Sequence, residues 1–339
     1  MSYRRLIAAF SILLLSSPAY AYNKTPGKGI TITPARATWN TGHFHETIIR
    51  KGLKELGYTV KKPVELSVPL FSKAAQLGDV DYWPNAWFPL YDSFLAKNDK
   101  LVKVGYIVKG EALQGYLIDK KHAELLNIKS LNDFRRPEVR KAFDRNGNGK
   151  ADLTSAPHGW QVGPVVKDHI KRYELTEYIE PINAAYIAAM AANIAALKNG
   201  EPIFYYTWTP SWTVFELRPG KEVMWINVPF NYAPEGSDQK PENMKVYDVE
   251  GAVTNPIDMG FSVADIRFCA NEDFIKQNPP VKLFFELFKI NIEDLNAQYA
   301  KLHAGEKSPA DIERHANEWI ETNRELWDSW LEQVRSSVN

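Results

Sequence analysis

The sequence predicts an α/β protein made of two similar lobes with a ligand cleft between them. Short apolar segments of strand character alternate with segments whose apolar residues recur at helical spacing, the pattern of an α/β sheet. One local arrangement also occurs twice: a helix ends at a glycine, a short strand follows, and a Trp-x-Pro sequence closes it. The two copies contain Trp87 and Trp208, and we expect one copy in each lobe.

The chain begins with a segment typical of a secretory signal peptide. Arg4 and Arg5 are positive, residues 6–15 are apolar but too short to span a bilayer, and residues 19–21 form a small-residue cleavage site. We therefore expect residues 1–21 to be removed by cleavage after Ala21, which leaves an exported chain without a membrane anchor.

The charge and the cysteine content of the chain argue against a nucleic-acid-binding protein and against a fold held by disulfides. The formal net charge is zero and falls to about −2 when Arg4 and Arg5 are removed, so the mature chain lacks the basic surface of a nucleic-acid-binding protein. Cys269 is the only cysteine, which rules out an internal disulfide, and its apolar neighbours predict a buried, unreactive thiol. The mature chain of about 318 residues is long enough for two domains.

The first lobe opens with strands at residues 29–33 and 58–60, separated by a helix that ends at Gly57. Residues 70–77 predict a second helix, ending at Gly78 before the first Trp-x-Pro.

Two strands, at residues 101–108 and 113–119, are predicted next, and the second is where the chain enters the other lobe. Residues 260–270 carry it back. These crossings divide the mature chain into three ranges: lobe 1 at 22–114, lobe 2 at 115–256, and the second part of lobe 1 at 257–339.

The second lobe contains an alanine-rich helix at residues 184–197, and the C-terminal third is helical. Ser308 and Pro309 predict a helix start. We expect the alanine-rich helix to pack through Ile187, Met190, Ile194 and Leu197, and the last helix to pack through Trp319, Leu326, Trp327, Trp330 and Val334.

Residues 204–212 hold five aromatic side chains and no charge. Strands of an α/β sheet present their carboxyl ends to a crevice where ligands bind. We therefore expect Trp87 and Trp208 to face each other across the cleft; the alternative is two unrelated core tryptophans.

A third tryptophan lies in a tight loop before a helix predicted to begin near Pro164. Free N–H groups at a helix N-terminus attract anions. Trp160 and the backbone N–H groups of Gln161 and Val162 therefore offer one ligand an aromatic face and an anion site, unless Trp160 is an ordinary loop residue.

Three tryptophans around one cleft suit a quaternary ammonium group, which is recognised by aromatic cages. Each face contributes roughly 0.5–2 kcal/mol, so three faces together supply several kcal/mol. This sum is a fair share of the ~8 kcal/mol of a micromolar complex. Sugars also stack on tryptophan but need carboxylates and amides around the ring. Enzymatic signatures such as G-x-S-x-G, H-E-x-x-H and the P-loop are absent from the sequence.

Residues 144–155 are similar to a calcium-binding loop. Oxygen ligands fall at Asp144, Asn146, Asn148 and Asp152, with glycine at the sixth position. The twelfth position is Ser155, where a bidentate acid is expected. The loop predicts either a structural calcium site or an Asn/Gly-rich turn.

Nearly the whole mature chain resembles the ProX-type family of substrate-binding proteins of glycine betaine/proline betaine ABC importers. The resemblance is carried by residues 26–31, 56–60, 114–121, 147–154 and 173–176, and most strongly by residues 204–210 and 217–221.

This resemblance implies a periplasmic binding protein of the two-lobed, type II-like fold, which needs no cofactor and delivers its ligand to an inner-membrane permease. It implies a cage of Trp87, Trp160 and Trp208 for the ammonium group, with the carboxylate held by the N–H groups of Gln161 and Val162.

The chain departs from the family at two places. Tyr91 stands where similar proteins have a histidine that holds the carboxylate, and its hydroxyl can still donate. Ser155 and Val162 stand where some relatives have a cysteine pair that staples the loop.

From the sequence we therefore predict a monomeric, non-catalytic binding protein for glycine betaine or proline betaine. Choline, carnitine or a sulfonium compound is the alternative ligand, and an exported carbohydrate-active enzyme is the alternative class.

Overall fold

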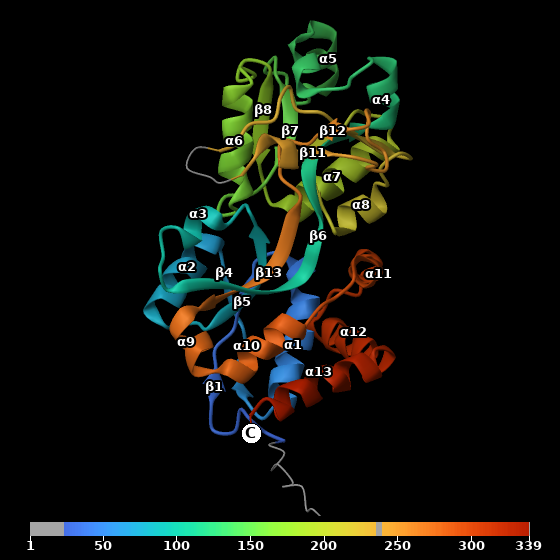
Figure 1. Ribbon diagram of the computed structural model, residues 1–339. Helices are drawn as coiled ribbons and strands as arrows, with labels where there is room; N and C mark the ends of the chain where they lie inside the picture. The colour runs from blue at the N-terminus through green and yellow to red at the C-terminus, as the bar shows by residue number, and fades with distance from the viewer. Residues whose placement is uncertain (1–23, 235–238, 339) are drawn as a thin grey trace, which may run out of the picture.

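The computed structural model describes residues 24–234 and 239–338; the predicted signal peptide therefore lies outside the described residues. Figure 1 shows a two-lobed α/β molecule, as predicted. We call one part the terminal lobe, because it contains both ends of the described chain, and the other the middle lobe. No helix within the described residues is both long enough and apolar enough to cross a bilayer.

A sheet of seven strands runs through both lobes of the described structure. Its order is β5-β13-β6-β9-β7-β8, and β10 pairs with β6 beside this path. The strands are β5 (Tyr82–Phe88), β6 (Leu101–Asp119), β7 (Ala151–Ser155), β8 (Ile179–Asn183), β9 (Phe204–Thr209), β10 (Val223–Ile226) and β13 (Ala264–Asn271).

The longest strand, β6, links the lobes. Its first part pairs with β13 as far as Ala112, and the part from Leu113 onward pairs with β9. The prediction of two separate strands here was wrong. Gly105 and Gly110 have positive φ angles of 50° and 68°, which interrupt the regular alternation while the strand continues.

The terminal lobe contains two small parallel strand pairs, β1 with β3 and β2 with β4. Their bounds, and those of the helices around them, are β1 (Thr31–Ile32), β2 (Ala35–Ala37), η1 (Asn40–Gly42), α1 (His43–Glu55), β3 (Thr59–Val60), β4 (Val64–Leu66), α2 (Val68–Leu77) and α3 (Asp92–Leu95). Helix α1 buries Phe44, Ile48 and Leu53 and is followed by Gly57 with φ = 91°, and α2 ends at Gly78, both as predicted.

The middle lobe places helices on both sides of its strands (Figure 1). These elements are α4 (Lys120–Leu125), η2 (Leu131–Arg135), α5 (Pro137–Phe143), α6 (Val162–Arg172), α7 (Tyr186–Lys198), α8 (Trp212–Glu216), η3 (Pro241–Met244), β11 (Lys245–Val246) and β12 (Ile257–Asp258). Helix α7 is the predicted alanine-rich helix, but its buried face differs from the predicted one. Tyr186 is buried in place of Ile187, which is 56 % exposed.

The C-terminal helices complete the terminal lobe: α9 (Glu272–Gln277), α10 (Pro279–Leu287), α11 (Ile292–His303), α12 (Pro309–Thr322) and α13 (Arg324–Ser336). Ser308 caps α12 and forms a capping box with Asp311, which confirms the predicted helix start. The predicted final helix is two helices, divided at Asn323. Leu326 is 46 % exposed and therefore does not belong to the apolar stripe.

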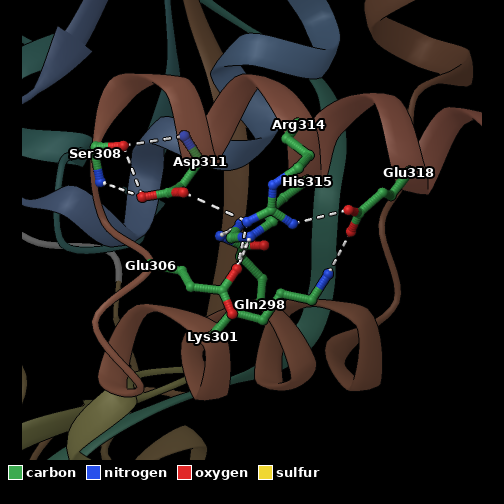
Figure 2. A network of polar contacts seen from close by, with 8 residues as sticks. All are labelled: Gln298, Lys301, Glu306, Ser308, Asp311, Arg314, His315 and Glu318. Atoms are coloured by element: carbon green, nitrogen blue, oxygen red, sulfur yellow. Dashed lines mark hydrogen bonds and ion pairs between the residues drawn. The ribbon is translucent and has the colours of Figure 1, made fainter.

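A polar network joins α11 to α12 (Figure 2). Glu318 accepts hydrogen bonds from Lys301 (2.7 Å) and Arg314 (2.9 Å). The buried ring of His315 accepts from Gln298 (3.0 Å) and donates to Glu306 (2.9 Å). The network fixes the packing of α12 beside α11, on the far side of the terminal lobe from β5.

Candidate functional site

Trp87 and Trp208 occupy corresponding positions near the ends of β5 and β9. Both side chains are buried. In each case the strand follows a helix and a glycine in the left-handed conformation, Gly78 (φ = 80°) or Gly200 (φ = 77°). The predicted internal similarity is therefore present in three dimensions, with one copy in each lobe.

One pocket between the lobes is lined by all six residues predicted to hold the ligand. Its lining comprises those six, Trp87, Tyr91, Trp160, Gln161, Val162 and Trp208, together with Trp39, Leu90, Gln114 and Tyr206. None of these ten side chains carries a formal charge. As far as the described residues line it, the pocket is thus aromatic and neutral, and none of these residues supplies the carboxylic acid that a carbohydrate-active enzyme needs in its cleft.

Trp160 is the centre of the aromatic lining. Its ring centroid lies 5.4 Å from that of Trp208 and 5.4 Å from that of Trp39, with interplanar angles of 73° and 66°. Trp39 comes from the terminal lobe, whereas Trp160 and Trp208 come from the middle lobe. The two lobes therefore touch through indole rings at the pocket.

Trp87 is oriented by a buried chain of hydrogen bonds. Its indole N–H donates to Oδ1 of Asn85 (2.8 Å), and Nδ2 of Asn85 donates to Nε2 of His45 (3.1 Å). Burial lowers the pKa of His45 to about 3, so the ring is neutral and can accept this bond. This chain holds the indole of Trp87 against the pocket from behind.

The start of α6 supplies free backbone donors. The helix begins at Val162, two residues before the predicted start, and Gln161 is its N-cap without a side-chain hydrogen bond to the first turn. Among the described residues, the N–H groups of Gln161 and Val162 make no hydrogen bond. Together with the helix dipole, these groups form a site suited to an anion.

Tyr91 lies at the same pocket, at the start of α3. Its side chain is buried, and burial raises the pKa of its hydroxyl well above the usual value, which keeps the group protonated and able to donate. Within the described residues the hydroxyl has no hydrogen-bond partner.

Four lining residues were not predicted. Trp39 lies in the loop between β2 and η1, where no motif marks it. Gln114 and Tyr206 lie on strands beside Trp208: Gln114 is its partner in the β6–β9 register, and Tyr206 precedes it by two residues. Strand alternation points out Tyr206, but finding Gln114 requires the register.

The predicted calcium ligands are already occupied by donors. The carboxylate of Asp144 accepts from the N–H groups of Gly147 (2.8 Å) and Gly149 (2.8 Å), and that of Asp152 accepts from the N–H groups of Arg145 and Asn146. Across residues 24–234 and 239–338 no three His, Cys, Asp or Glu side chains are grouped to hold a metal ion. These contacts favour the alternative of an Asn/Gly-rich turn.

Cys269 is buried on β13, as predicted. Burial raises the pKa of its thiol to about 12, so the group stays protonated and unreactive.

Comparison with known proteins places these features in a family. Residues 30–322 match the family model described as the substrate binding domain of ABC-type glycine betaine transport systems. The chain is 35 % identical to the glycine betaine/proline betaine-binding periplasmic protein of Salmonella typhimurium over 330 residues, 96 % of both chains. It is 37 % identical to the glycine betaine-binding periplasmic protein OusX of Dickeya dadantii over 331 residues, again 96 % of both.

Solved structures support the same fold. Lactococcal OpuAC, in a closed complex with glycine betaine, has a TM-score of 0.66 at 18 % identity and covers 89 % of this chain and 99 % of its own. A choline-binding protein of an ABC transporter, in complex with choline, has a TM-score of 0.65 at 16 % identity, with 91 % and 98 % covered. The fold therefore accommodates ligands with and without a carboxylate.

Proposed function

The chain belongs to the family of substrate-binding domains of ABC-type glycine betaine transport systems, and we propose that its pocket captures glycine betaine or proline betaine. The observation that carries this proposal is the convergence of Trp87, Trp160 and Trp208, from both lobes, on one pocket in which no described lining residue is charged. The protein delivers its ligand to an ABC permease and performs no catalysis.

The ammonium end of the ligand lies against the three indole rings. A quaternary ammonium has no N–H group to donate, so an anionic side chain could attract it only through charge. Indole faces attract the cation through the cation–π interaction and also exclude water from it. Trp87 approaches from the terminal lobe and Trp208 from the middle lobe, so that closing the lobes completes the cage.

The carboxylate end lies at the first turn of α6. The N–H groups of Gln161 and Val162 and the hydroxyl of Tyr91 are donors without acceptors among the described residues. Tyr91 thus takes the place of the histidine expected from the family. Three donors around one carboxylate favour a zwitterion over choline.

The curated relatives are periplasmic. For this chain we place cleavage after Ala21, a monomeric mature protein, and lobes at residues 22–114, 115–256 and 257–339. The boundary after residue 114 is supported by the change of partner along β6, from β13 to β9. The pairing of β12 with β11 in the middle lobe favours a return to the terminal lobe between β12 and β13.

For the loop at residues 144–152 we propose a metal-free turn. Both aspartates accept hydrogen bonds from backbone N–H groups of the loop, and these bonds support the turn without an ion.

Calorimetric titration of the mature chain with glycine betaine, and separately with choline, tests the function. We expect tight binding of glycine betaine and weak binding of choline. Choline binding without betaine binding would retain the cage and overturn the carboxylate site, and binding of neither would overturn the proposal. Trp319→Phe, on α12 and outside the pocket, is the matched control and is expected to bind as the wild type does.

A further inference from the structure

Gln114 is a buried polar residue at the ligand pocket to which neither the sequence nor the family comparison assigns a role. Its side chain is 4 % exposed and lies on β6, where this strand passes from one lobe to the other. In the strand register it faces Trp208, so the two side chains share one face of the sheet.

One half of the Gln114 amide has a fixed partner. Oε1 accepts a hydrogen bond from the hydroxyl of Tyr206 at 2.7 Å, within buried surroundings. Burial raises the pKa of Tyr206 well above its usual value, so this hydroxyl is protonated and donates. The bond sets which end of the amide is oxygen and which is nitrogen.

The other half of the amide has no partner. Among the described residues, Nε2 makes no hydrogen bond, and the surrounding protein atoms do not enclose it completely. It therefore opens on the pocket that Gln114 lines. A nearly buried amide with two unused N–H donors is costly unless an acceptor reaches it.

The position of Gln114 indicates which acceptor this is. A neighbouring cavity is lined by Gln114 together with Leu90 and Val165. Leu90 adjoins Tyr91, and Val165 belongs to the first turns of α6. Gln114 therefore borders Trp208 on one side and, on the other, residues next to Tyr91 and in the first turns of α6, where the other free donors lie.

We propose that Nε2 of Gln114 donates a hydrogen bond to the ligand carboxylate and that Gln114 thereby selects carboxylated ligands over choline. This inference rests on the proposed function. It adds a side-chain donor, held by Tyr206, to the main-chain donors of α6.

Gln114→Met and Gln114→Glu test the inference by titration with glycine betaine and with choline. Methionine keeps the length and removes the donor, so we expect betaine affinity to fall roughly 10- to 100-fold, the range for a hydrogen bond to a charged group, with choline affinity changed less than about 3-fold. Glutamate places a negative charge beside the carboxylate, so betaine binding should fall further while choline binding is kept or improved.

Equal losses for both ligands in the two variants would overturn the inference, because a purely structural role of Gln114 affects every ligand alike. Unchanged betaine affinity in Gln114→Met would also overturn it. These outcomes leave the proposed function intact, whereas a wild-type protein that binds no betaine overturns both. A melting curve of each variant, with choline binding as a second check of the fold, identifies a variant that has not folded.

Discussion

Replacing Trp160 by alanine removes two interactions that the structure separates. One is the aromatic face proposed for the ammonium group. The other is the contact with Trp39, which joins the two lobes at 5.4 Å. The contact with Trp208 lies within the middle lobe, so its loss lowers the stability of that lobe and has little effect on closure.

The expected loss of affinity follows from these two terms. A desolvated cation–π face is worth about 2 kcal/mol, and an aromatic pair about 1 kcal/mol beyond its buried area. The sum of about 3 kcal/mol corresponds to a roughly 150-fold higher dissociation constant for glycine betaine.

Calorimetry on the wild type, Trp160→Ala, Trp39→Ala and the double variant separates the terms. If the rings touch in the closed complex, the sum of the binding free energies lost in the two single variants exceeds the loss in the double variant. The difference, about 0.5–1.5 kcal/mol, is the coupling energy of the pair. Trp319→Phe serves again as the control.

A dissociation constant for Trp160→Ala within about 2-fold of the wild type would refute the cage, since even the weakest cation–π face exceeds that change. Strict additivity in the cycle would refute only the contact between lobes.

Three further predictions concern stability and support of the site. His45 and His169 are buried, and burial lowers their pKa values to about 3. As the pH falls below 6.5, these two side chains therefore bind protons in the unfolded chain but stay neutral in the folded one. Lowering the pH from 7.5 to 5 should reduce the unfolding free energy by roughly 2 kcal/mol for each histidine. In urea denaturation, His169→Gln, which keeps an acceptor for Tyr116, should reduce this pH dependence by that amount, and an unchanged dependence would contradict the assignment. Asn85→Leu leaves the indole N–H of Trp87 without its acceptor and should lower the unfolding free energy by about 2 kcal/mol and weaken betaine binding several-fold; unchanged binding would show that Trp87 needs no support from Asn85. The melting temperature should be the same in millimolar calcium and in chelator, and a rise with calcium would restore the calcium site at residues 144–152.

The sequence carried enough information for the parts of the site that depend on local signals. The glycine, strand and Trp-x-Pro order identified Trp87 and Trp208 as a pair, and the helix start after Trp160 identified the free N–H groups. The structure brings these residues to one pocket, and their roles in binding are the proposal made above.

Long-range packing decided what the sequence could not indicate. Trp39 is brought to the pocket by contacts with Trp83 and Trp160, which are distant in the sequence. The length of β6 was missed because residues 109–112, which contain Gly110, are indistinguishable in sequence from a turn between two strands. A Cβ at Gly105 would collide with the carbonyl oxygen of Phe285, so packing against α10 requires this glycine.

The pairing of β5 with β13 also sets an order of events in the synthesis of the chain. Apart from one isolated bridge between Tyr82 and Pro34, residues 82–88 pair with residues 265–270, which are made much later. Contacts between segments so distant in sequence form slowly, and the terminal lobe cannot close its sheet while the later segment is still being made. For a chain with a predicted export signal, this delay has a use: a polypeptide that has not yet folded can still be threaded through a narrow pore. The topology that builds one lobe from both ends of the chain thus delays completion of that lobe until the last part of the chain has been made.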